Sequence, residues 1–221
     1  MQQLKLKVKA LQQLTAGIKK FEFVSLDGRE LPPFTAGAHI DFHLENGLVR
    51  SYSLANDPKE THRYVTAILR EDDGGGGSKY MHENVSVGDE LNITPPANNF
   101  RLSEEASEHI LLAGGIGITP LLAMGYNLKL DGNPCHLYYC TKSREETAFS
   151  EEVEEIFGVE LSSLSDIEKL DGLVLAVPHA PYLDMSTEQL CSFLVADGIF
   201  IDVKSVVNTD QIPHKIMYWA L

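Results

Sequence analysis

The spacing of apolar residues changes near residue 100, and this change constrains the fold more than any other feature. Before it, apolar and polar residues alternate in short stretches such as LKLKVKAL (residues 4–11). After it, apolar runs such as HILLAGG (109–115) precede segments of helical spacing such as TPLLAMGYNLKL (119–130). Period-two alternation is typical of strands with one buried face, whereas apolar strands between helices are typical of a parallel sheet. The sequence therefore predicts a β domain followed by an α/β domain.

The first part of the chain, residues 1–102, is predicted to form a small antiparallel barrel. Turn signals such as Asp27-Gly28 and Asn46-Gly47 separate its alternating stretches. Six strands are expected, at residues 4–11, 18–26, 38–44, 48–55, 62–70 and 89–96.

The second part, residues 103–221, is predicted to form a doubly wound parallel sheet, with the boundary at residues 100–106. Its expected strands are 109–115, 135–141, 170–179 and 198–206, all in one sheet. Its expected helices are 119–130, 147–158 and 186–198. Thr119 is the predicted N-cap of the first helix, with Pro120 at the first helical position, and Ser186 or Thr187 caps the last helix.

Charge and cysteine content exclude several classes of protein. The net charge of −14 disfavours nucleic-acid binding and favours a basic protein partner. Three scattered cysteines form neither a disulfide framework nor a four-Cys iron–sulfur site, which indicates a reducing cytoplasm. The apolar stretch from Ile110 to Met124 has 15 residues and is interrupted by glycines and Pro120, whereas a membrane span needs about 20. No membrane association is expected, and the N-terminus reads as a strand.

Three motifs point to a phosphate-bearing ligand. AGGIGITP (113–120) places glycines between a strand and a helix N-terminus, where backbone N–H groups can bind a phosphate; a plain tight turn is the alternative. RSYSLANDP (50–58) places Arg50 and Tyr52 on one strand face, which suits a phosphate and a flat ring, although surface Arg–Tyr pairs are common. REDDGGGGSKYMH (70–82) is either a flexible hairpin loop or an anion cradle.

The combination of these motifs, in this order, resembles the phthalate dioxygenase reductase and vanillate demethylase reductase group of the ferredoxin–NADP reductase superfamily. The resemblance covers about residues 3–157. It is carried by FTAGAHIDFHLENGLVRSYSLANDP, YVTAILREDDGGGGSKYMHENVSVGDELNITPPANNF, HILLAGGIGITPLLAM and HLYYCTKSREETAF. It implies a flavin-binding barrel in residues 1–102 and a NAD(P)-binding-like domain after it. FMN is the expected flavin, with FAD possible, and NADH or NADPH is the electron donor.

The resemblance also implies roles for individual residues. Arg50 would hold the flavin phosphate, Tyr52 would lie against the flavin ring, and Ser53 would lie near its reactive nitrogen. The other expected flavin contacts are Ala67 and Leu69 at the ring edge and Gly77 and Ser78 at the phosphate. The expected nicotinamide contacts are Gly114, Gly115, Gly117 and Thr119, with Thr119 and Pro120 near the flavin. Ser53 and Thr119 are the predicted catalytic residues, and no metal site is expected.

The implied function is electron transfer in a Rieske-type oxygenase system, from a nicotinamide nucleotide through a flavin. Because no iron–sulfur ligands occur in this chain, the acceptor would be a separate protein, a Rieske oxygenase or a ferredoxin. The Cys-Gly-Pro segment typical of such reductases is also absent. A catalytically impaired flavin-binding remnant is therefore an alternative.

Residues 159–221 resemble a different family, the C-terminal end of UDP-sugar dehydrogenases. The likeness is carried by His179 after a strand, Asp202-Val203-Lys204 and Tyr218-Trp219. It implies a chimeric chain, with a UDP-sugar-binding module as a further alternative function.

Four smaller features leave alternatives open. His39, Asp41 and His43 share a strand face, either as metal ligands or as a polar barrel face. Cys140 ends a strand without an evident histidine partner, and the glutamates of EEVEEIF (151–157) fit a solvated helix face. Lys142 and Arg144 fit either a nucleotide 2′-phosphate or solvent exposure, which leaves the choice between NADH and NADPH open.

Overall fold

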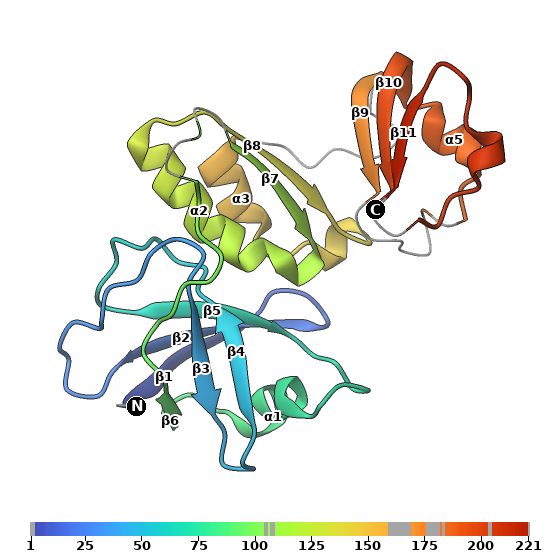
Figure 1. Ribbon diagram of the computed structural model, residues 1–221. Helices are drawn as coiled ribbons and strands as arrows, with labels where there is room; N and C mark the ends of the chain where they lie inside the picture. Colours follow the sequence, from blue (N-terminus) through green and yellow to red (C-terminus); the bar gives the residue numbers. More distant parts are fainter. Residues whose placement is uncertain are drawn as a thin grey trace. The chain divides into compact units, whose positions relative to one another are not determined.

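The computed structural model describes residues 3–103, 106, 109–158, 169–175, 182, 184–202 and 205–220 (Figure 1). The chain separates into two compact units, Met1–Val159 and Glu160–Leu221, each with its own apolar core. The predicted boundary after residue 102 lies inside the first unit, where one apolar cluster runs from the antiparallel sheet to the helices that follow it.

The six predicted strands are confirmed and form one antiparallel sheet in the order β4-β3-β6-β1-β2-β5. Alternation produces this sheet because buried apolar side chains line one face: Phe21 and Phe23 of β2 and Phe42 of β3 have no exposed surface. Burying each such ring contributes about 1.5–3 kcal/mol. The bounds of the strands are β1 Leu4–Gln13, β2 Ile18–Ser25, β3 His39–His43, β4 Val49–Ser53, β5 Tyr64–Leu69 and β6 Glu90–Ile93.

The two edge strands of this sheet, β4 and β5, line a common cavity, so the sheet curls into a barrel. In the β3–β4 hairpin, Arg50 pairs with Phe42 and Tyr52 pairs with Ile40. Directly opposed residues of antiparallel strands share a face. Arg50 and Tyr52 therefore lie on the face that carries the barrel core, at its open edge.

A short helix, α1 (Gly77–Asn84), follows the glycine run, so the second half of residues 70–82 is not a loop, which was one of the two alternatives. The helix begins after Gly76, whose φ of 78° is in the left-handed region, and no side chain caps it. It is anchored by Met81 and Val85, which are buried in the barrel core. Burial of these two side chains outweighs the low helix propensity of Gly77.

The rest of the first unit contains two parallel strands, β7 (His109–Gly114) and β8 (Cys135–Cys140), with helices α2 (Ile118–Asp131) and α3 (Ser150–Phe157) (Figure 1). Both helices end at left-handed glycines, Gly132 and Gly158, and the predicted end at Gly158 is confirmed. On the other face of the strand pair, Ile110 and Leu112 are 64% and 50% exposed.

The prediction that Thr119 caps α2 is wrong. Gly115–Gly117 form a 3-10 turn, and the helix starts directly after it at Ile118. The turn already bonds the first N–H groups, since the N–H of Ile118 is directed to the carbonyls of Gly115 and Ile116. The Thr119 hydroxyl instead donates to the Ile116 carbonyl at 3.0 Å.

The second unit contains a three-stranded parallel sheet in the order β11-β10-β9 and helix α5. Its elements are β9 (Leu170–Leu175), α5 (Thr187–Cys191), β10 (Leu194–Asp202) and β11 (Met217–Ala220). The predicted start of the helix is confirmed, because Ser186 forms a capping box with Gln189.

The prediction that this helix extends to residue 198 is wrong. The chain pairs as β10 with a strand on each side, which satisfies its backbone groups and buries Phe200. The sequence predicts that these strands join β7 and β8 in one sheet. The described strands of this unit instead pair with one another.

Candidate functional site

Most of the predicted flavin-contacting residues converge on one cavity of about 210 Å³ at the open edge of the barrel. Six predicted residues line it: Arg50, Tyr52, Ala67, Leu69, Gly77 and Ser78. Four further lining residues were not predicted: Ile68, Glu71, Gly75 and Ile116. β4, β5, the start of α1 and the glycine turn after β7 each contribute to the lining, so segments far apart in sequence meet here.

Arg50 fixes the loop at one end of this cavity. Its guanidinium donates to the carbonyl of Gly75 at 2.7 Å and to that of Val49 at 2.8 Å. A Cβ atom on Gly77 would lie 2.4 Å from Cγ of Arg50, and one on Gly75 would lie 2.6 Å from its Nη2. The side chain of Arg50 therefore packs directly on the glycine backbone, which has room for it only because side chains are absent there.

The start of α1 adds further donors at the same end. The first N–H groups of a helix have no partner within the helix and carry a partial positive charge. The Ser78 hydroxyl accepts the Glu71 N–H at 3.1 Å, which leaves its own proton available to donate. A guanidinium, a helix N-terminus and a hydroxyl form a donor set that suits a phosphate.

Tyr52 supplies a flat, neutral surface in the lining of the same cavity. Its ring packs at a tilt against Phe42, with centroids 5.8 Å apart. Burial raises the pKa of the Tyr52 phenol to about 12; Arg50 opposes this rise and Glu71 adds to it. The phenol therefore stays protonated at physiological pH and presents an uncharged ring beside the cationic end.

The remaining predicted residues are not part of the cavity lining, and their roles stay predictions. Ser53 ends β4 opposite His39, and the Thr119 hydroxyl is held by the Ile116 carbonyl. Gly114 ends β7, and Pro120 lies in α2; Gly115 and Gly117 form the turn between them. Only Ile116 of this turn reaches the cavity. No signal in the sequence singles out this residue, because its position depends on how the turn meets the barrel.

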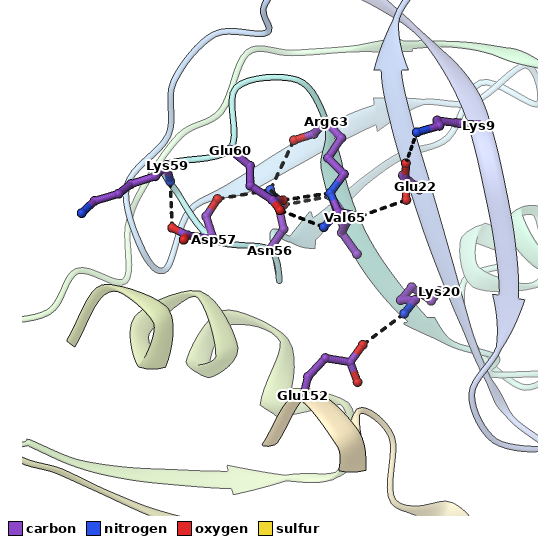
Figure 2. A network of polar contacts seen from close by, with 10 residues as sticks. All are labelled: Lys9, Lys20, Glu22, Asn56, Asp57, Lys59, Glu60, Arg63, Val65 and Glu152. Atoms are coloured by element: carbon purple, nitrogen blue, oxygen red, sulfur yellow. Dashed lines mark hydrogen bonds and ion pairs between the residues drawn. The ribbon is translucent and has the colours of Figure 1, made fainter. Parts of the chain in front are cut away.

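A larger hollow of about 540 Å³ lies between the barrel and helices α2 and α3, away from the predicted residues. Its charged groups are largely paired with each other (Figure 2). Arg63 donates to Glu60 at 2.8 Å and to Glu22 at 3.1 Å. Lys20 of β2 reaches Glu152 of α3 at 3.1 Å and lies 5.7 Å from the centre of the Phe149 ring. This pairing fits a joint between barrel and helices better than a site for a charged ligand.

The histidines and Asp41 of β3, Cys140 and Lys142 are the other candidates from the sequence, and their contacts in the structure do not form a site. Asp41 accepts a hydrogen bond from Ser51 and His43 bonds Thr94, and the described residues include no group of three or more metal-ligating side chains. Burial raises the pKa of the Cys140 thiol, which disfavours the reactive thiolate. Lys142 lies 3.9 Å from Glu146. In the described part of the chain, no helix is long and apolar enough to cross a bilayer.

In the second unit, the features shared with UDP-sugar dehydrogenases are only partly described. His179, Val203 and Lys204 lie outside the described residues. Asp202 is fully buried and accepts hydrogen bonds from the Val207 N–H and the Tyr218 hydroxyl, whereas Trp219 is 67% exposed. These contacts give Asp202 a structural role within the sheet, and the likeness to UDP-sugar dehydrogenases stays a prediction.

Comparison with known proteins identifies several reductases as relatives. The vanillate O-demethylase oxidoreductase of Acinetobacter baylyi is 46% identical over 147 residues, which is 66% of this chain and 46% of that protein. The phthalate 4,5-dioxygenase oxygenase reductase subunit of Pseudomonas putida is 47% identical over 149 residues, 67% of this chain and 46% of that protein. The chain thus spans about half the length of these relatives. No protein-family model matches it.

A solved structure extends the likeness to the fold. It is phthalate dioxygenase reductase, a modular protein for electron transfer from pyridine nucleotides to a [2Fe–2S] centre. The two structures align with a TM-score of 0.70 and 30% identity, over 99% of this chain and 68% of the other. This chain shares with that structure the antiparallel barrel, the parallel α/β part and 30% of its aligned residues. The chain therefore belongs to the phthalate dioxygenase reductase family.

Proposed function

We propose that the first unit binds FMN and carries electrons from a nicotinamide nucleotide to a separate acceptor protein. In this proposal the chain is the reductase component of a Rieske-type oxygenase system. The observation that carries it is the single cavity in which Arg50, Tyr52 and the start of α1 meet Ile116 of the glycine turn. A flavin supplies the chemistry, since it accepts a hydride and releases single electrons.

The cavity suits a ligand with one terminal phosphate and a ring. The Arg50 guanidinium, the N-terminus of α1 and the Ser78 hydroxyl surround one end, where Gly75 and Gly77 leave room for Arg50. Tyr52, Ala67 and Leu69 are also part of the lining. This compact donor set favours FMN over FAD, whose second phosphate and adenosine would need further partners.

The chain's own residues would then act by position. Tyr52 would support the flavin ring, and Ser53 would lie near its reactive nitrogen, as the resemblance implies. Gly114, Gly115, Gly117 and Thr119 would bind the nicotinamide nucleotide, and Thr119 and Pro120 would lie near the flavin. The net charge of −14 favours an acceptor with a basic docking surface, a Rieske oxygenase or a ferredoxin.

Titration of the purified protein with FMN and with FAD, followed by visible absorption and flavin fluorescence, tests the proposal. FMN should bind, and Arg50→Ala should weaken that binding about tenfold to a hundredfold through loss of a charge-assisted contact. Anaerobic addition of NADH or NADPH should then bleach the flavin absorption. Absence of flavin binding would refute the proposal, and binding without reduction by either nucleotide would support the impaired remnant instead.

A further inference from the structure

The cavity at the barrel edge contains one carboxylate among its lining residues, Glu71. This residue lies two positions after the end of β5, in the loop that leads to α1. Its backbone N–H donates to Ser78, and its side chain lies against Gly74, where a Cβ atom would be 3.2 Å from Oε2. Glu71 is thus tied to the end of the cavity that carries the phosphate donors.

Neighbouring bases do not neutralise this carboxylate in the described part of the chain. The guanidinium of Arg50 is directed to backbone carbonyls. Arg70, the adjacent base, pairs with Asp72 and Glu83, both at 2.8 Å. The charge on Glu71 does act on the cavity, since it adds to the rise in the Tyr52 pKa.

A bound terminal phosphate would therefore meet a negative charge within its own site. A phosphate monoester carries about −1.5 to −2 charges at pH 7. A carboxylate beside it disfavours this charge, whereas an uncharged ligand that fills the rest of the cavity is unaffected.

We propose that Glu71 is a specificity-determining residue that selectively weakens the hold on a dianionic terminal phosphate and so keeps the flavin exchangeable. This inference rests on the proposed flavin site. It implies that the cavity binds FMN less tightly than its donor set allows, and that removing one negative charge strengthens FMN binding without changing the binding of riboflavin, which has no phosphate.

Glu71→Gln tests this inference, because it removes the charge and keeps the shape. Asp73→Asn is the matched control: Asp73 is an exposed acid in the same loop that does not line the cavity. Flavin fluorescence titrations would give the Kd of each variant for FMN and for riboflavin at low and high salt.

We expect Glu71→Gln to tighten FMN binding about three- to tenfold at low salt, the scale of one unit charge acting across a solvated site. The gain should shrink at high salt because the pair is exposed to solvent. Riboflavin binding should change less than about twofold, and Asp73→Asn should have a smaller effect on FMN than Glu71→Gln has.

Three results would overturn the inference while leaving the flavin site intact. Equal gains for FMN and riboflavin would show that Glu71 acts on the ring or by shape. Weaker FMN binding by Glu71→Gln would show that the carboxylate accepts a hydrogen bond from the ligand. Unchanged FMN binding would show that its charge is fully screened. Failure of the unaltered protein to bind either flavin is a different outcome, since it would refute the proposed function itself.

Discussion

Replacing Gly77 with alanine should weaken FMN binding while leaving the fold as stable as before. Gly77 is the first residue of α1, and its φ is not in the left-handed region, so alanine fits its backbone. Alanine also favours helix over glycine by up to about 1 kcal/mol. This gain offsets the loss of the hydrogen bond between Arg50 and the Gly75 carbonyl, so the free energy of unfolding should change by less than about 1 kcal/mol.

The effect on binding follows from the contact between Gly77 and Arg50. The new Cβ atom would lie 2.4, 2.7 and 2.9 Å from Cγ, Nε and Cδ of Arg50, all closer than real Cβ contacts. Arg50 must move aside, and its bond to the Gly75 carbonyl is lost with it. If the guanidinium no longer reaches the phosphate, a charge-assisted contact worth about 1.5–3 kcal/mol disappears. The Kd for FMN should then rise about tenfold to a hundredfold.

A double-mutant cycle identifies the cause. FMN titrations would compare Gly77→Ala, Arg50→Ala and the double variant, with urea unfolding of each as the stability control. Because both single changes remove the same contact, the double variant should bind FMN no more weakly than Arg50→Ala. A further tenfold loss in the double variant would refute this reasoning, since the methyl group would then obstruct the ligand itself. A fall of more than 1 kcal/mol in the stability of Gly77→Ala would also refute it.

Two further predictions concern the joint in Figure 2. Lys20→Gln should lower the free energy of unfolding by about 0.5–1 kcal/mol, because it removes the partly exposed ion pair with Glu152 and the cation over the Phe149 ring. A double-mutant cycle with Glu152→Gln, measured by urea unfolding, checks the ion pair. A coupling energy near zero would show that the pair does not stabilise the fold. Partial burial alone would raise the pKa of Glu60, but Arg63 offsets this and holds it below its usual range. Stability from Glu60 is therefore present above the carboxyl's unfolded-state pKa and lost as the pH falls through its folded-state value. Unfolding monitored by circular dichroism between pH 7 and pH 3 should show a shallower loss for Arg63→Gln than for the unaltered chain, and equal slopes would show that Arg63 does not set this pKa.

The barrel could be predicted from sequence because each strand has one buried face, and period-two alternation records that burial directly. Helix α1 could not, because it follows a run of glycines, begins with Gly77, and is stabilised by Met81 buried in the barrel. The sequence predicts a strand for the second part of β10, from residue 198, but assigns Leu194–Asp197 to the preceding helix, since LVADGIFID lacks strict alternation. Its identity as a strand depends on the neighbours β9 and β11, which no local pattern specifies.

The same distinction applies to the site. Arg50 and Tyr52 could be grouped from sequence because residues two apart on a strand share a face. Glu71 and Ile116 could not, since they reach the cavity only when the loop after β5 and the turn after β7 close on the barrel edge. Tertiary contacts of this kind produce no periodic pattern of residues in the sequence.

The bare outer face of β7 and β8 has a consequence for how the first unit opens. Ile110, Leu112 and Tyr138 are already 64%, 50% and 57% exposed, so separating these strands uncovers less new apolar surface than opening the barrel. Local opening should therefore cost less free energy in this strand pair than in β1 or β2, and its amide hydrogens should exchange with solvent first. A ligand that binds only the closed form stabilises the segment it touches. A nucleotide held by the turn after β7 would thus protect the part of the unit that otherwise opens most readily.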